Sequence, residues 1–512
     1  MRTFSDDEVV DVVVVGTGAG GAPLLAELAR AGLRVVALEA GGWFDPSEYT
    51  SDETTAAEIN WMDERLSGGS DPTAFGTNNS GRGVGGSTLH WGAFCPRPDP
   101  RDLLLRSSSG QGTDWPITHA ELTGYLERAE RDIGVAGPRR YPWDPDRRYA
   151  YAPPGRNASA DMMMRGCDAL GIRATDAPAA LVTRDRHQDE HGLRAACAGC
   201  GSCHQGCRNG AKVSMPVTYL PVATAHGAEI RAGSTVHGIE TDARGLVTGV
   251  VYRRDGVDHR QRCAALVLAG GGVETPRLLL HTGLANGSGQ VGRNFMAHPA
   301  VQVWGRFDVE MRSWRGYPSS LISEDMVRPD GADFVGGYLM QSLGVMPSAF
   351  GTTLTRGAGL WGRPLVEAMR DYPFMGGIGI NGESLPSDAN RLELSDEVDE
   401  LGVPKARVGY SLGPNEQAIT THAIDTMRRI LEAAGARSTM VLDRTAHTVG
   451  TCRMGDDRDT AVVDSSGRSF DVGNLWVCDG SVFPSSLAAN PALTIMALSL
   501  RTAAKMLGAR PS

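Results

Sequence analysis

A glycine-rich turn between an apolar strand and a helix constrains this fold more than any other feature of the sequence. Residues 11–15 (DVVVV) are rich in β-branched side chains, which favours a central parallel strand buried on both faces. The pattern G-x-G-x-x-G follows at 16–21 and leads into leucines at helical spacing, which end near Gly32. A second apolar run then ends at Glu39. This strand–turn–helix–strand order predicts an α/β, Rossmann-like dinucleotide-binding domain.

Each part of this unit has a reason connected with a bound dinucleotide. Gly16 permits the tight turn, and Gly18 lets a pyrophosphate approach the backbone. The N-terminus of the following helix attracts the negative charge of the phosphates. Glu39 is placed to accept hydrogen bonds from a ribose. Both NAD and FAD fit a unit of this kind.

The far end of the chain supplies a second turn of interest. Residues 474–484 (NLWVCDGSVFP) predict a strand that ends at Asp479 and Gly480. We expect a final helix after it, with Asn490 at the cap position and Pro491 just inside. The partial positive charge of that helix N-terminus suits the anionic N1–C2=O region of a reduced flavin.

Composition and charge narrow the class of protein. A chain of 512 residues exceeds one ordinary domain. The net charge is −10 and no Lys/Arg-rich block stands out, which argues against a nucleic-acid partner. Acidic residues occupy the place of a basic signal-peptide region, and no apolar run approaches the ~18 residues of a membrane helix. We therefore expect a cytoplasmic protein with no membrane span, in which thiols stay reduced.

Five motifs in a fixed order resemble the glucose-methanol-choline (GMC) oxidoreductases. Besides the N-terminal turn, SGRGVGGSTLHWG (80–92) and LAGGGVETPRLLLHTGL (268–284) are similar to the first and second family signatures. HTVGTCRMG (447–455) and DGSVFPSSLAANPALT (479–494) are similar to the C-terminal signatures. The resemblance covers most of the chain, and it implies that the cofactor is FAD.

The same resemblance implies which residues hold the flavin. Val236 matches a position whose backbone contacts adenine, and Asp479 matches one that bonds the ribityl chain. His90-Trp91 is similar to pyranose oxidases and to sugar dehydrogenase large subunits, and in some relatives that histidine is joined to the flavin; here we expect a non-covalent flavin. The implied cofactor-binding residues are Gly16, Gly18, Gly21, Glu39, Gly85, Gly86, Ser87, His90, Trp91, Val236, Asp479, Gly480, Asn490 and Pro491.

Two residues are the candidates for catalysis. Oxidation of an alcohol needs a base for the hydroxyl proton, and histidine is effective near neutral pH. His447 opens the motif HTVGTCRMG, and the resemblance implies that it is this base. Asn490 matches the second catalytic position, where an amide can hold the substrate oxygen as charge develops. His298, in RNFMAHP, is expected to be structural or at the margin of the site.

Four cysteines lie within eleven residues of one another. Cys197, Cys200, Cys203 and Cys207 follow the spacing C-x2-C-x2-C-x3-C, as in bacterial ferredoxins. The first three could ligate one iron–sulfur cluster, and Cys207 could be a fourth ligand or lie outside the cluster. Zinc suits this spacing less well. The sugar dehydrogenase large subunits carry a similar insertion, which holds a cluster in some of them. The alternative is a glycine- and cysteine-rich loop without metal.

The domain organisation follows from where these motifs fall. Weak alternation of apolar residues after position 300 predicts an antiparallel sheet in a substrate domain. Aromatic residues and prolines at 143–155 predict a loop or lid. We expect a discontinuous FAD-binding domain at 1–100, 213–300 and 441–512, an insertion with the lid loop and the cysteines at 101–212, and a substrate-binding domain at 301–440.

Two functions remain open at the level of the sequence. The first is an FAD-dependent oxidoreductase that acts on CH–OH groups of a sugar, glycoside or polyol, with oxygen or a protein as electron acceptor. The alternative is a dehydrogenase or electron-transfer subunit that passes electrons through an iron–sulfur cluster to a partner protein. A nucleotide-binding protein without redox chemistry is disfavoured, because His447 and Asn490 would then be idle.

Overall fold

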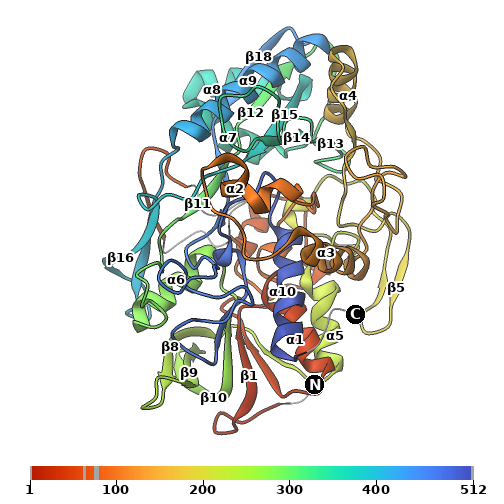
Figure 1. Cartoon of the computed structure of the whole chain (residues 1–512). Coiled ribbons are helices and arrows are strands. Elements are labelled where there is room, and N and C mark those ends of the chain that lie inside the picture. The colour runs from red at the N-terminus through yellow and green to blue at the C-terminus, as the bar shows by residue number, and fades with distance from the viewer. Residues whose placement is uncertain (1–2, 61–64, 74–79, 509–512) are drawn as a thin grey trace.

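Two sheet-containing regions are stacked along the long axis of the molecule, and the middle of the structure lies between them (Figure 1). The computed structural model describes residues 3–60, 65–73 and 80–508. The N-terminal strand, its glycine turn and the last helix belong to the lower region, while most of the chain between 301 and 442 belongs to the upper one.

The lower region contains the predicted Rossmann-like sheet. Its parallel part has the order β7-β2-β1-β10, with β20 also paired to β10. The first half of β10 pairs instead with β9 in antiparallel fashion, so the long strand joins the parallel sheet to a β8–β9–β10 meander. The strands are β1 (Val10–Val15), β2 (Val35–Leu38), β7 (Glu229–Arg231), β8 (Thr235–Thr241), β9 (Val247–Arg254), β10 (Val257–Leu268) and β20 (Leu475–Val477).

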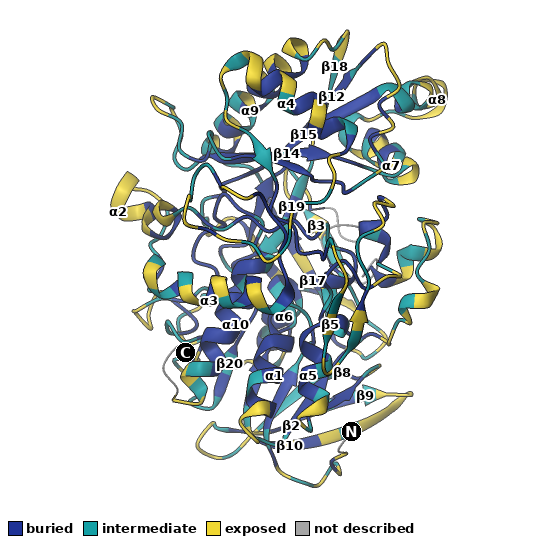
Figure 2. Ribbon diagram, turned by 90° about the vertical axis from the view of Figure 1, so that its right-hand side faces the viewer, coloured by how far each residue is buried: buried dark blue, intermediate teal, exposed yellow. Residues whose placement is uncertain are grey.

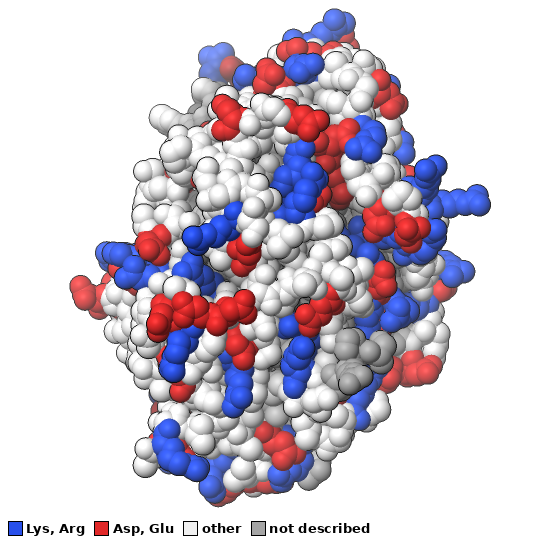
Figure 3. Space-filling model, viewed as in Figure 1, with Lys and Arg blue, Asp and Glu red and all other residues white. Residues whose placement is uncertain are grey.

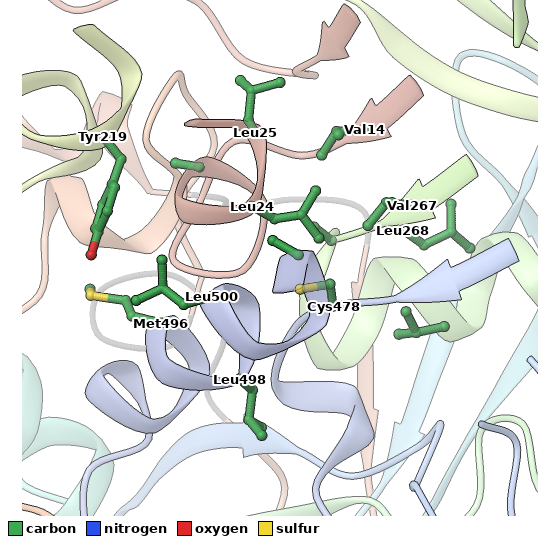
Figure 4. Packing of buried hydrophobic residues seen from close by; sticks show 14 of the residues in the cluster. Val14, Leu24, Leu25, Tyr219, Val267, Leu268, Cys478, Met496, Leu498 and Leu500 are labelled. Carbon is green, nitrogen blue, oxygen red and sulfur yellow. The ribbon is translucent and has the colours of Figure 1, made fainter. Parts of the chain in front are cut away.

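Apolar packing ties the first and last helices to this sheet. Helix α1 (Gly21–Arg30) packs against α10 (Ala492–Met506) and α5 (Tyr219–Ala225), and Figure 4 shows the interface from close by. Each fully buried Leu contributes roughly 1.5–3 kcal/mol relative to an exposed one. The two ends of the chain are thereby held together at the glycine turn. Labelled core residues are Val14, Leu24, Leu25, Tyr219, Val267, Leu268, Cys478, Met496, Leu498 and Leu500.

One hydroxyl fixes the start of α1 against α10. The Ser499 hydroxyl accepts a hydrogen bond from the Leu24 N–H at 3.0 Å and donates one to the Gly20 carbonyl at 2.5 Å. A side chain at Gly20 would place its Cβ 1.9 Å from the Cys478 carbonyl oxygen. Gly20 therefore lets α1 approach the end of β20, a close contact that the fingerprint motif does not predict.

The upper region is the predicted antiparallel sheet. Its strands have the order β18-β12-β15-β14-β13-β4, and helices α4 (Ala158–Leu170) and α9 (Pro414–Ala433) pack on it. Strand β4 enters from the segment before residue 301, so the sheet draws on both the expected insertion and the expected substrate domain. The strands are β4 (Thr175–Asp176), β12 (Gln302–Arg306), β13 (Leu321–Ser323), β14 (Tyr338–Leu343), β15 (Met375–Gly382) and β18 (Ser438–Leu442).

Smaller pieces connect the two regions. Strands β11 (Met296–Pro299) and β19 (Thr445–Val449) form an antiparallel pair in the middle of the molecule. The remaining strands are β3 (Arg65–Gly68), β5 (Arg186–Gln188), β6 (Gly192–Arg194), β16 (Arg391–Val398) and β17 (Pro404–Gly409). The remaining α-helices are α2 (Leu105–Ser109), α3 (His119–Ile133), α6 (Gly271–Thr282), α7 (Pro347–Ala358) and α8 (Gly362–Asp371).

The proline-rich segment 143–155 has little regular secondary structure, which agrees with the predicted loop. It is packed against the rest of the protein. Arg147 is buried and pairs with Glu130 at 2.5 Å, and the Trp143 indole donates to Asp325 at 2.9 Å. None of its residues lines the central cavity. The segment therefore gives no structural support to the expected role as a lid.

The distribution of surface charge and the composition of the helices bear on two expectations, that the protein has no nucleic-acid partner and no membrane span. Acidic and basic side chains are interspersed on the face shown in Figure 3, and exposed residues lie outside a continuous buried interior in Figure 2. Within the described ranges, no helix combines the length and the apolar composition that crossing a bilayer requires.

Candidate active site

A cavity of about 670 Å³ extends from the glycine turn after β1 to the segment that carries His447. Most of the residues expected at the site lie in its wall. Gly21 and Gly85 are outside it: a Cβ on Gly21 would lie 2.0 Å from the Gly16 carbonyl oxygen, and Gly85 has a φ of +111°. The expected residues that line the cavity are Gly16, Gly18, Glu39, Gly86, Ser87, His90, Trp91, Val236, His447, Asp479, Gly480, Asn490 and Pro491.

Glycine occupies positions 16 and 18 of the turn for different physical reasons. Gly16 has a φ of +99°, and a Cβ there would lie 2.4 Å from the Ala269 carbonyl oxygen, so the fold itself requires glycine. A Cβ on Gly18 would meet nothing closer than the Gly86 Cα at 3.7 Å. The protein alone would accept a side chain at Gly18, which borders the cavity. A ligand that lies against the backbone is the reason that remains for glycine at this position.

Glu39 both shapes the turn and faces the cavity. Its Oε2 accepts hydrogen bonds from the Thr17 N–H at 3.0 Å and from the Thr17 hydroxyl at 2.8 Å, and its Oε1 accepts one from the Gly41 N–H at 3.1 Å. Burial raises the pKa of this carboxyl, while those hydrogen bonds oppose the change. Each oxygen keeps acceptor capacity, which a ribose hydroxyl could use.

Asp479 stands where β20 ends and α6 begins. Its Oδ2 accepts from the Gly271 N–H at 2.8 Å and from the Thr275 hydroxyl at 2.6 Å, and its Oδ1 accepts from the Ser481 N–H at 2.8 Å. The carboxylate thus sits at the N-terminus of α6, where the helix dipole stabilises negative charge. These contacts fix its orientation in the cavity wall.

His90 is a buried histidine without a partner. In the part of the chain that the structure describes, neither of its ring nitrogens has a hydrogen-bond partner. Burial, with contributions from Lys212 and His204, lowers its pKa to about 3, so the ring is neutral. Buried ring nitrogens without hydrogen-bond partners cost folding free energy, unless a bound group in the cavity supplies the missing partners. Trp91 differs, because its indole N–H already donates to the Val213 carbonyl at 2.7 Å.

A bulge in the β11–β19 pair aims His447 at the cavity. Met296 faces Val449 and His298 faces Ala446, so three steps along β19 match two along β11. His447 takes the extra position with a φ of +64°, a conformation that few non-glycine residues adopt. Strain of this kind persists where the surrounding structure over-determines it, and it concentrates at functional sites.

His298 determines which nitrogen of His447 is free. Its Nε2 lies 3.1 Å from the Ser486 carbonyl and 3.0 Å from the Leu487 carbonyl, so Nε2 carries the hydrogen. Burial lowers the pKa of His298 to about 4, which keeps the ring neutral and leaves Nδ1 as an acceptor. The Nδ1 of His447 lies 3.0 Å from that atom and must donate to it. The lone pair of His447 is therefore on Nε2.

Asn490 faces that lone pair. Its Nδ2 lies 3.3 Å from His447 Nε2, and its Oδ1 accepts a hydrogen bond from Asn381 Nδ2 at 3.0 Å. The predicted cap role of Asn490 was wrong by one residue, since α10 begins at Ala492 with Pro491 at the cap position. The amide of Asn490 is engaged by Asn381 and His447 and makes no side-chain cap.

Burial also keeps His447 neutral. Its pKa is lowered well below the ordinary value, first by burial and then by the neighbouring His298 and the positive charge of Arg444. The ring is neutral at pH 7, so it is able to accept a proton. His298, expected to be structural or at the margin of the site, is in direct contact with His447, and Asn381 was not anticipated at all.

The four cysteines lie beside the cavity in a different arrangement from a ligand set. Cys203 opens the short turn whose next residues, His204 and Gln205, line the cavity. Cys203 is buried, Cys197 and Cys207 are half-buried, and Cys200 is exposed. Among the described residues, no three His, Cys, Asp or Glu side chains are grouped so that they could hold a metal ion. The arrangement does not fit an iron–sulfur cluster or zinc.

The fold and the cavity together define a dinucleotide-binding protein of the α/β class, with two histidines in contact beside the cavity. Comparison with protein families matches the GMC oxidoreductase N-terminal domain at residues 64–300 and the C-terminal domain at 386–499. The chain belongs to the GMC oxidoreductase family, and it is an FAD-dependent oxidoreductase.

Curated relatives and solved structures extend over almost the whole chain. The 2-methyl-1,2-propanediol dehydrogenase of Mycolicibacterium austroafricanum is 31% identical over 98% of this chain and 95% of its own length. The fructose dehydrogenase large subunit of Gluconobacter japonicus is 31% identical over 96% of this chain and 97% of its own. The crystal structure of pyridoxine 4-oxidase from Mesorbium loti has a TM-score of 0.66 at 16% identity, covering 98% of this chain and all of that one, which shows the shared fold.

The residues present fit FAD. The open side of Gly18 leaves room for a pyrophosphate at the N-terminus of α1, and Glu39 keeps acceptor capacity for a ribose. His90 supplies an unpaired polar ring farther along the same wall. These observations are independent of one another, and each is explained by a bound dinucleotide.

Proposed function

We propose that the protein oxidises a CH–OH group of a sugar, glycoside or polyol to a carbonyl, with His447 as the base. The observation that supports this most directly is the unprotonated Nε2 of His447, which points at Asn490 in the cavity wall. The relatives named for a diol and for a sugar agree with such a substrate.

FAD, when bound, supplies the two-electron acceptor for the hydrogen that leaves the substrate carbon as hydride. Gly16, Gly18, Glu39 and Asp479 would hold the cofactor. The hydroxyl proton passes to His447 Nε2, so the alcohol loses two electrons and two hydrogens in all. Oxygen or another oxidant must then take the electrons to complete the cycle.

His447 and Asn490 have different roles toward the substrate oxygen. His447 Nε2 accepts its proton, and Asn490 Nδ2 can donate a hydrogen bond to the oxygen as negative charge develops. Asn381 holds the amide of Asn490 with its nitrogen toward the base. The base is rigid, because the bulge and His298 fix the ring.

The test is anaerobic reduction of the FAD-loaded enzyme by a panel of sugars and polyols, followed as loss of the visible flavin absorbance. His447→Ala should slow flavin reduction by ~10²–10⁴-fold while the flavin stays bound. His226→Ala, at an exposed histidine away from the cavity, is the matched control and should leave the rate unchanged. An unchanged rate in His447→Ala with full flavin content would move the base elsewhere. Failure of every alcohol to reduce the wild-type flavin would reject the proposed function.

A further inference from the structure

Arg444 is a charged residue of the cavity wall that the proposed chemistry does not use. It lies between β18 and β19, three positions before His447, and it is half-buried. Throughout the described residues its guanidinium has no hydrogen-bond or ion-pair partner, and burial alone accounts for the lowering of its pKa. Its backbone is ordinary, with the carbonyl accepting from the Ala300 N–H at 3.0 Å.

A guanidinium without a partner is unusual in such a position. It carries five N–H donors, and removing an uncompensated charge from water is costly. Other arginines of the same wall are paired: Arg65 with Glu274 at 3.0 Å and Arg277 with Asp399 at 2.6 Å. Arg444 stands apart from them, so its donors are available to something that enters the cavity.

The acidic residues of this part of the cavity do not neutralise Arg444. Glu53 accepts from the Ser348 N–H at 2.6 Å and the Ala349 N–H at 2.8 Å, and so serves the start of α7. Asp443, the next residue, has a pKa raised by burial and by Asp71, with no contribution from Arg444. The positive charge is therefore uncompensated where it meets the cavity.

The position of Arg444 points to the substrate rather than to the phosphates of the cofactor. Its charge lowers the pKa of both His447 and His204, which places it at the base. It follows a strand of the upper sheet, and β19 lies between that sheet and α1 (Figure 2). Gly18 and the N-terminus of α1 belong to the lower region, where the pyrophosphate would bind.

A second arginine reaches the same part of the cavity. Arg356, on α7, is exposed, lines the cavity, and has no ion-pair partner within the described ranges. The Asp443 N–H donates to the Gly357 carbonyl at 3.3 Å, so the segments that carry the two arginines are in contact. The substrate end of the cavity thus has two cations without carboxylate partners.

We propose that the substrate bears a carboxylate, as a sugar acid or a related polyhydroxy acid does, and that Arg444 binds it. One guanidinium balances the single charge of a carboxylate and can bind both of its oxygens. Arg356 adds attraction at the mouth. The proposal rests on the proposed function and narrows its substrate class, because the anchored acid would present a neighbouring CH–OH group to His447.

The test compares acids with their neutral amides on the FAD-loaded enzyme. D-Gluconate and D-glucuronate are each paired with the corresponding amide, and the concentration dependence of anaerobic flavin reduction gives the second-order rate constant for each. The wild type should prefer an acid over its amide by on the order of 10²-fold, and Arg444→Gln should remove that preference by slowing the acid alone. Arg444→Lys should retain part of it, while Arg140→Gln, at an exposed arginine outside the cavity, should change nothing.

A binding measurement provides a second readout that does not need turnover. Calorimetric titration with malonate, which has no hydroxyl, should show binding to the wild type and at least ~10-fold weaker binding to Arg444→Gln. Equal use of acid and amide, equal slowing of both by Arg444→Gln, or preference for a sugar phosphate would overturn the proposal. If neutral sugars alone reduce the flavin, the proposed function stands and this inference fails. If no alcohol reduces it, the proposed function fails, and malonate binding still decides the role of Arg444.

Discussion

The imidazole of His298 stands perpendicular to that of His447, with ring centroids 4.9 Å apart. The two residues are 149 positions apart in the chain and meet because β11 and β19 are paired. Since the Nε2 of His298 is held by two backbone carbonyls, only its Nδ1 can accept from His447. We therefore propose that His298, which does not line the cavity, is a positioning residue that fixes the tautomer of the proposed base.

Replacing His298 should impair the base without removing it. His298→Leu leaves His447 Nδ1 without an acceptor, so we expect the limiting rate constant for flavin reduction to fall by ~10²-fold, with little change in the apparent Kd of the substrate. His298→Asn retains an acceptor oxygen and should recover part of the loss. Stopped-flow reduction across a pH series should also show a shifted apparent pKa for His298→Leu. If His298→Leu lowers the free energy of unfolding but leaves the rate of flavin reduction and its pH profile unchanged, His298 has a structural role only.

The amide of Asn490 should matter for the developing charge on the substrate oxygen. Asn490→Ala removes the Nδ2 donor that faces His447, and we expect kcat/KM to fall by ~10²–10³-fold. Asn381→Ala releases the amide rather than removing it and should cost less. Steady-state kinetics with one accepted substrate distinguish the two. Equal losses in both variants would mean that Asn381 does more than orient Asn490.

Gly18 tests whether a ligand explains the glycine turn. A Cβ there meets no protein atom within 3.7 Å, so Gly18→Val should fold yet lose FAD, because the side chain occupies the place of the pyrophosphate. Gly42→Val is the control, since Gly42 is exposed and has nothing within 4 Å of a Cβ. The ratio of flavin to protein absorbance after purification gives the answer. Full flavin content in Gly18→Val is the result that contradicts this assignment.

The sequence predicted best what is local. The strand, turn and helix at residues 10–30 depend on neighbours in the chain, and they appear where the pattern places them. The antiparallel sheet after residue 301 was also predicted, because its strands alternate over a few residues. The cap of α10 was misplaced by one residue, since a tertiary contact to Asn381 competes with the local capping preference of Asn490.

The contacts of the site could not be predicted in the same way. His298 reaches His447 only through strand pairing, and no spacing within RNFMAHP reveals it. The cysteine spacing predicts ligands, but spacing does not determine which way each thiol points, and the exposed Cys200 and buried Cys203 lie in different environments. The free charge of Arg444 is equally invisible in sequence, because pairing depends on which acids the fold brings near.

Lys212 links the cysteine segment to the part of the cavity wall at residues 88–91. Its buried ammonium donates to the Leu89 carbonyl at 2.8 Å, the Trp91 carbonyl at 3.2 Å and the Thr88 carbonyl at 3.3 Å. Lys212→Met leaves these acceptors without a donor, and we expect a loss of about 2–4 kcal/mol in unfolding free energy with weaker FAD binding.

Urea unfolding and FAD titration check the role of Lys212. The control is Lys405→Met, which removes only a surface pair with Glu397 and should cost less than about 1 kcal/mol. If the two variants are equally stable and bind FAD equally well, the three carbonyl contacts contribute little and the wall is held by other residues.

Acid should destabilise the protein through its buried histidines. The pKa of His298 is about 4 in the folded state, against about 6.5 in an unfolded chain, so the unfolded state binds the proton first. The stability that neutral burial contributes is complete above pH about 6.5 and is lost as pH falls toward 4. Between pH 7 and pH 5, this one residue should cost about 2 kcal/mol of unfolding free energy.

His298→Leu cannot titrate at this position, so its deficit in unfolding free energy relative to the wild type should shrink by that amount over the same range. Urea unfolding at both pH values measures the deficit, with His226→Leu, at an exposed histidine, as a control whose difference should stay constant. A deficit for His298→Leu that does not change with pH would show that folding does not shift the pKa of His298. A deficit that grows as pH falls would show that His298 is already protonated in the folded protein, and the tautomer assigned to His447 would then have to be reversed.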